Sequence, residues 1–121
     1  MAAHRRKGNV ELVRLAGELR KGARANAAPI WSAVADRLER ARHQTVPVNV
    51  GHLERLTESG ETVVVAGKLL AEGRLAKRLT VGAFRFSAEA KAKVHAAGGT
   101  TLSLPEILKA HPDGSGVRLL G

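Results

Sequence analysis

Apolar residues recur at helical spacing through the N-terminal third of the chain, and this pattern restricts the fold more than any other feature. Between residues 12 and 23 the apolar side chains fall on one face of a helix, with charged side chains opposite. A second pattern of Ile30, Val34 and Leu38 follows Pro29, a residue favoured in a first helical turn. The sequence therefore predicts two amphipathic helices within residues 9–45, with Asn9 as the first N-cap.

Residues 46–121 carry short apolar runs separated by turn residues, which predicts a mixed region of strands and helices. Residues 62–65 are β-branched throughout and give the strongest strand pattern. Ala66–Gly67 is predicted to end that strand, and Pro47 confines the extended piece before it to a sheet edge. Further strands are predicted over residues 68–70, 79–86, 100–102 and 117–120, and helices after Asn49, after Ser87 and after the capping box of Ser103 and Glu106.

Aromatic side chains make up only 2% of the 121 residues, so aliphatic side chains must build the core. We expect Val63, Val64, Val65, Leu102 and Leu119 to lie at its centre. Stacking of bases on aromatic rings, a common way to bind single-stranded RNA, has few candidates here. The single tryptophan is expected in the core, and the fold class is α+β in one domain.

The formal net charge is +9 and the sequence pI is near 11.1, which favours a polyanionic partner. Thirteen of the 20 basic residues are arginines, whose planar guanidinium binds phosphate in a bidentate manner. A nucleic acid is the favoured partner, and an anionic membrane surface is the competing one. No apolar run approaches the length of about 20 residues that a membrane-spanning helix needs.

The basic residues divide the chain into three regions: an N-terminal arm of residues 1–8, a helical RNA-binding region of residues 9–45 and a mixed α/β core of residues 46–121. Residues 1–45 hold ten basic and four acidic residues, a net charge of +6, against +3 for the remainder. The candidate RNA-binding residues are Arg5, Arg6, Lys7, Arg14, Arg20, Lys21, Arg24, Arg37, Arg40, Arg42, His43, Lys68, Arg78, Arg85 and Arg118.

No motif in the chain predicts catalysis, a metal or a cofactor. Gly67–Lys68 lacks the flanking glycine and hydroxyl residue of a phosphate-binding loop. Ser115, between two glycines, would need a positioned base to be a nucleophile, so the loop is either a plain turn or a place where RNA phosphate approaches backbone. The histidines show no metal-ligand spacing, and cysteine is absent, which excludes disulfides and thiol catalysis.

Four segments in order carry a family resemblance: NVELVRLAGELRKGARANAAPIWSAVADRLERARH, VNVGHLERLTESGETVVVAGKLL, FSAEAKAKVHAAGG and GSGVRLL. Together they resemble the archaeal member of the eL-eighteen family of large-subunit ribosomal proteins, also called eighteen-e, which is related to bacterial large-subunit protein fifteen. The resemblance extends from about Asn9 to Leu120. One departure is Ala66, where the family often has proline.

The resemblance implies N-terminal helices followed by an irregular superhelix of β-β-α units. It also implies a cytoplasmic, non-enzymatic protein of the ribosome whose partners are large-subunit ribosomal RNA and neighbouring ribosomal proteins, with no membrane and no small-molecule substrate. The alternative is a free-standing RNA-binding protein or RNA chaperone outside the ribosome. An enzyme is the third reading, and a pocket with a base beside Ser115 would favour it.

Overall fold

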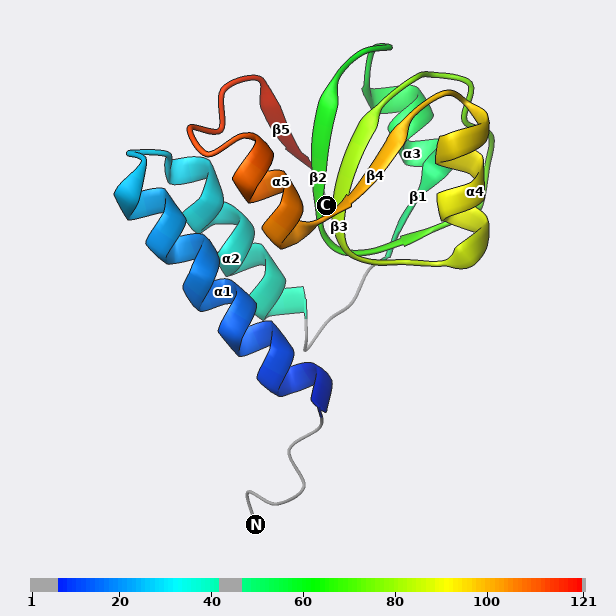
Figure 1. Ribbon diagram of the computed structural model, residues 1–121. Helices are drawn as coiled ribbons and strands as arrows, with labels where there is room; N and C mark the ends of the chain where they lie inside the picture. The colour runs from blue at the N-terminus through cyan, green and yellow to red at the C-terminus, as the bar shows by residue number, and fades with distance from the viewer. Residues whose placement is uncertain (1–6, 42–46, 121) are drawn as a thin grey trace.

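Two antiparallel helices, α1 (Lys7–Ala25) and α2 (Pro29–Ala41), begin the fold of this computed structural model, which describes residues 7–41 and 47–120. They pack against each other along one side of a sheet (Figure 1). Pro29 opens α2 as predicted, because its fixed φ suits the first helical turn and its missing N–H would be unpaired there anyway.

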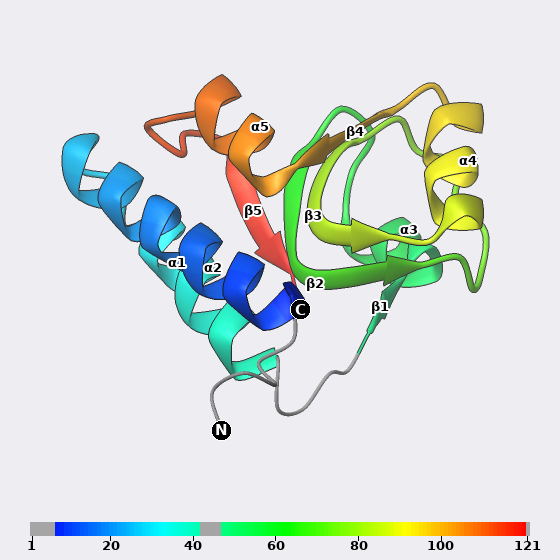
Figure 2. The same ribbon diagram turned by 60° about the horizontal axis from the view of Figure 1, so that its bottom comes forward.

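The described strands form one five-stranded sheet in which every pair is parallel. Its longest strand, β2, pairs with β3 along one edge and with both β1 and β5 along the other. Because β2, β3 and β4 follow one another in the chain and lie side by side in parallel, the chain winds as a coil through them (Figure 2). The strands are β1 (Val48–Asn49), β2 (Thr62–Leu70), β3 (Thr80–Phe86), β4 (Thr100–Ser103) and β5 (Val117–Leu120).

Helices cover both faces of this sheet, which confirms the α+β class with helices at the N-terminal end. The helices α1, α2 and α5 (Leu104–Ala110) lie on one face, and α3 (Val50–Leu56) and α4 (Ala88–Ala96) lie on the other. Burial on both faces explains why residues 62–65 read as a continuous apolar run rather than an alternating one.

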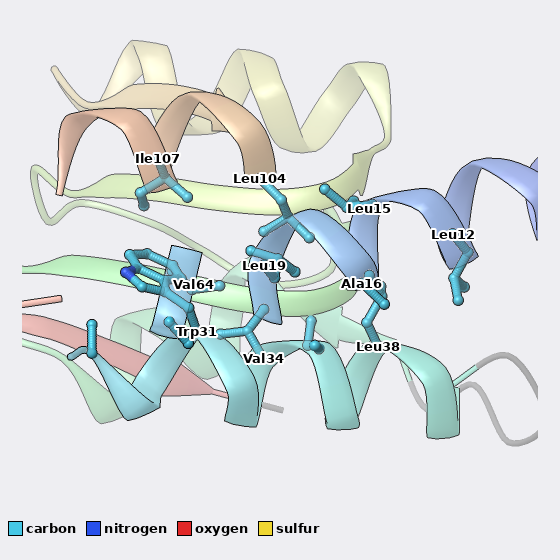
Figure 3. Packing of buried hydrophobic residues seen from close by; sticks show 14 residues of the cluster. Leu12, Leu15, Ala16, Leu19, Trp31, Val34, Leu38, Val64, Leu104 and Ile107 are labelled. Atoms are coloured by element: carbon cyan, nitrogen blue, oxygen red, sulfur yellow. The ribbon is translucent and has the colours of Figure 1, made fainter. Parts of the chain in front are cut away.

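Two aliphatic clusters form the core, one on each face of the sheet. Val64 points into the cluster with α1, α2 and α5, whereas Val63 and Val65 point into the cluster with α3 and α4. Figure 3 shows the first cluster, with Val64 and Trp31 between the helices. The predicted central positions of the three valines are therefore confirmed, while Leu102 and Leu119 are half-buried residues that pack against the first cluster.

The N-caps predicted for three helices are confirmed: Asn49 for α3, Ser87 for α4 and Ser103 for α5. The hydroxyl of Ser87 accepts the N–H of Ala90 at 3.1 Å, and Ser103 and Glu106 form the predicted capping box. The backbone N–H of Ser103 donates to Glu106 Oε1 at 2.7 Å, and this bond holds the pKa of Glu106 below its usual value.

Two boundary predictions were wrong. Helix α1 begins at Lys7, so Asn9 lies within its first turn and is not the N-cap. Strand β2 does not end at Ala66–Gly67 but continues to Leu70, because one extra residue is absorbed as a register shift against β3 between Val65 and Lys68.

The loop after α5 closes over the indole of Trp31, which is fully buried as expected. Its Nε1 donates to the carbonyl of Pro112 at 3.0 Å, so the one polar atom of this ring is satisfied. Gly114 has φ +69°, and a Cβ there would lie 2.4 Å from Cγ2 of Ile30. Packing against α2 therefore requires this glycine, which favours the structural reading of the loop.

Candidate nucleic-acid interface

The solvent-facing side of α1 carries three cations from the predicted set. Arg14, Lys21 and Arg24 are exposed on the side opposite the buried Leu15 and Leu19. None of the three makes a hydrogen bond or ion pair within the described part of the chain. Their charges are therefore available to an external anion, and the helix holds them in fixed order.

Two further predicted cations lie side by side at the carboxyl ends of β2 and β3. Lys68 and Arg85 are register partners, so their Cα atoms are about 5 Å apart. Arg85 donates to Glu11 Oε1 at 2.7 Å, and its guanidinium lies 4.7 Å from the centroid of the Phe84 ring. These contacts fix the direction of Arg85 and join the end of β3 to the first turns of α1.

A shallow groove of about 320 Å³ lies between α1 and the end of β3, and two acidic residues, Glu11 and Glu18, are part of its lining. Arg14 of α1 and Arg85 of β3 both line it, so the two groups of cations meet at this groove. We call Arg14, Lys21, Arg24, Lys68 and Arg85 the α1–strand surface. The full lining consists of Glu11, Arg14, Leu15, Glu18, Phe84, Arg85, Ser103, Leu104 and Pro105.

Helix α2 contributes two exposed arginines, Arg37 and Arg40, near its carboxyl end. That end lies beside the beginning of α1, because the two helices are antiparallel (Figure 1). The other predicted residues of this region, Arg5, Arg6, Arg42 and His43, lie outside the described residues. Only the backbone of Lys7 is described, as the first residue of α1.

Arg20, also predicted to bind RNA, is held by two carboxylates of α2. Its Nη2 donates to Asp36 Oδ1 at 2.9 Å and to Glu39 Oε1 at 2.5 Å. The hydrogen bond to Glu39, followed by that to Asp36, raises the pKa of the guanidinium above its usual value. Arg20 therefore joins the two helices and is a weaker candidate for an external contact than its neighbour Lys21.

Arg78 and Arg118 lie at the opposite end of the sheet from Lys68 and Arg85. Arg118 is paired in register with Val63 near the start of β2, and Arg78 precedes β3. The guanidinium of Arg118 donates to the carbonyl of Leu56 at 2.7 Å, which ties β5 to α3. These two residues are therefore separate from the α1–strand surface.

Two lysines outside the predicted RNA-binding set donate hydrogen bonds to backbone carbonyls within the fold. The ammonium of Lys77 donates to the carbonyls of Glu54 and Thr57 at the end of α3. Lys93 donates to the carbonyls of Ala71 and Gly73, both at 2.7 Å. They stabilise loops, and no spacing in the sequence distinguishes them from the exposed lysines.

The described residues contain no arrangement that suggests a metal site or a nucleophile. No three His, Asp or Glu side chains among them gather as metal ligands. Ser115 donates its N–H to Asp113 Oδ1 at 3.1 Å in a local turn, and the described chain places no histidine in hydrogen-bond contact with it. None of the described helices combines the length and apolar character needed to cross a membrane.

The fold and the α1–strand surface define a small basic helix-and-sheet protein suited to a polyanion. Residues 7–121 match the family model of "Ribosomal protein 60S L18 and 50S L18e". The chain belongs to this family of ribosomal proteins, which confirms the resemblance. Family membership also makes it a structural ribosomal protein and not an enzyme, as predicted.

Three curated relatives, each named large ribosomal subunit protein eL18, are similar over almost their whole length. The protein of Pyrobaculum aerophilum is 50% identical over 112 residues, covering 93% of this chain and 92% of the relative. That of Methanopyrus kandleri is 44% identical over 117 residues, with 93% and 92% covered. That of Archaeoglobus fulgidus is 42% identical over 115 residues, with 95% and 98% covered.

Proposed function

We propose that this chain is a component of the large ribosomal subunit in the cytoplasm, where it binds large-subunit ribosomal RNA and stabilises its folded form. Neighbouring ribosomal proteins are its other partners. The single observation that carries the proposal is the α1–strand surface, since a ribosomal protein that leaves Arg14, Lys21 and Arg24 without internal partners has charge to offer to RNA phosphate.

The proposed mechanism is neutralisation of phosphates where RNA segments approach each other. Each phosphate that meets a lysine or arginine releases condensed counterions, so binding gains entropy from the solvent. The cations of the α1–strand surface stand on a helix and on strand ends, so ordering them on RNA costs less entropy than ordering a flexible arm. With few aromatic rings exposed, recognition follows the shape of the RNA backbone more than base identity.

Sucrose-gradient fractionation of cell extract tests the proposal against a free-standing RNA chaperone. We expect the chain to migrate with large subunits and to remain there at moderate salt concentration. Recovery at the top of the gradient, with free protein, would contradict a role in the subunit and support the chaperone instead.

Adjacent residues Arg20 and Lys21 give a matched pair of variants for the α1–strand surface. Arg20→Ala should lower the unfolding free energy by about 1 kcal/mol, the upper range for a solvent-screened ion pair, and leave RNA affinity nearly unchanged. Lys21→Ala should change stability by less than about 0.5 kcal/mol. It should weaken RNA binding several-fold, because it removes one phosphate contact.

Urea denaturation and filter binding on the two variants measure these effects. Both variants lose one positive charge, so a difference between them reports where each charge lies and not the net charge. Equal losses of RNA affinity would show that the carboxylates of Asp36 and Glu39 release Arg20 to the RNA.

A further inference from the structure

Helix α1 contains two internal glycines whose surroundings differ. At Gly22 an added Cβ would lie 2.8 Å from Cδ1 of Leu108, so the missing side chain makes room for α5. At Gly17 an added Cβ would meet nothing within 4 Å. Because glycine is less favourable than alanine inside a helix, Gly17 weakens α1 without any packing reason inside the fold.

The residues around Gly17 mark it as the middle of a cationic line along α1. Arg14 and Lys21 stand three residues before and four residues after it, and Arg24 stands seven residues after, so all share its face. Arg14 and Lys21 are about 10 Å apart along the helix axis. At Gly17 the backbone of this face is exposed, and the long side chains of Arg14 and Lys21 can contact a ligand that lies against it.

The acidic residues of the same helix lie to one side of this line. Glu11 is paired with Arg85, and Glu18 lines the same groove as Arg14, so the acids border the line on the side of the groove. Two exposed apolar residues lie beside the line, Val10 and Val13, which are 42% and 44% exposed. Two part-exposed valines offer much less than the few hundred Å² of apolar surface that marks a protein interface. The surface therefore fits an anionic partner that comes close to helix backbone.

We propose that the ribose–phosphate backbone of one strand of large-subunit RNA crosses α1 at Gly17, with Arg14 and Lys21 on the phosphates at either side. A Cβ at this position would hold the strand away from the helix, which accounts for a glycine that the fold itself does not need. The inference rests on the proposed function and adds the point of closest approach.

Gly17→Leu tests the proposal, with Ala92→Leu as the matched control. Ala92 is an exposed small residue of α4, on the other face of the sheet. In titrations against a large-subunit RNA transcript that the wild-type chain binds, Gly17→Leu should reduce affinity about tenfold or more. Its Tm should equal or exceed that of the wild type, since leucine is a better helix former than glycine. Ala92→Leu should bind like the wild type.

The dependence of affinity on salt concentration should be the same for Gly17→Leu and the wild type, because no charge is removed. If Gly17→Leu binds the transcript with wild-type affinity, the proposed crossing at Gly17 is wrong, but the proposed function is unaffected. The proposed function fails only if the wild-type chain itself does not bind the transcript. Normal binding of the transcript combined with loss of Gly17→Leu from large subunits in a gradient would also overturn it, since a neighbouring protein would then occupy this face.

Discussion

Raising the KCl concentration from about 50 mM to about 200 mM is expected to weaken binding of this chain to large-subunit RNA by about a thousandfold. The estimate assumes about six neutralised phosphates, because each contact contributes about 0.9 to the slope and the affinity then falls with a power of salt concentration between five and six. The α1–strand surface supplies five cations, of which Arg85 must exchange Glu11 for phosphate, and the exposed Arg40 at the end of α2 is the sixth. Filter binding at four or five salt concentrations measures the slope.

Two single variants assign that slope to the proposed surface. Lys21→Ala should reduce the slope by about 0.9 on a double-logarithmic plot, the value for one phosphate contact. Arg74→Ala removes the same charge from the loop between β2 and β3, where the neighbouring Gly73 packs against α3, and should leave the slope unchanged. A flat dependence for the wild type, or equal slopes for the two variants, would contradict the electrostatic account.

Val64→Asp is expected to destabilise the fold by about 3–5 kcal/mol, the cost of an uncompensated buried charge. Val64 has no exposed surface and lies between the sheet and the helices α1, α2 and α5 (Figure 3). A domain of this size is stable by about 5–15 kcal/mol, so the variant should lose a large part of its stability. Urea denaturation should show a lower midpoint or no folded baseline.

Lys68→Asp is the control for this substitution, because it changes an exposed residue of the same strand. Its effect on unfolding free energy should be about 1 kcal/mol or less. Comparable losses for the two variants would mean that aspartate is poorly tolerated anywhere in β2, and the placement of Val64 at the core would not be supported.

The elements that depend on neighbouring residues could be predicted from the sequence, and those that depend on distant ones could not. Ser87 and Ser103 cap helices through bonds to residues three positions away, so their patterns are visible in the sequence. The continuation of β2 through Gly67 depends on pairing with β3, which the local pattern does not contain. The pairing of β5 with β2 joins residues more than fifty positions apart, and no local pattern marks it.

The candidate interface shows the same division. The net charge predicts a polyanionic partner, but it cannot say which cations are free. Arg20 and Lys21 are adjacent and equally charged, and only the packing of α1 on α2 gives Arg20 its two carboxylates. A glycine inside a helical pattern, such as Gly17, can be recognised in the sequence. Only the structure shows that no other residue packs against it. Whether Arg5, Arg6 and Lys7 contribute as a basic arm stays a prediction.

A structure of the assembled large subunit that contains this chain would show directly what lies against α1. We expect Arg14, Lys21 and Arg24 within ion-pair distance of RNA phosphates, with an RNA strand against the helix. An α1 face that is open to solvent or covered by another protein in the assembled subunit would contradict this expectation.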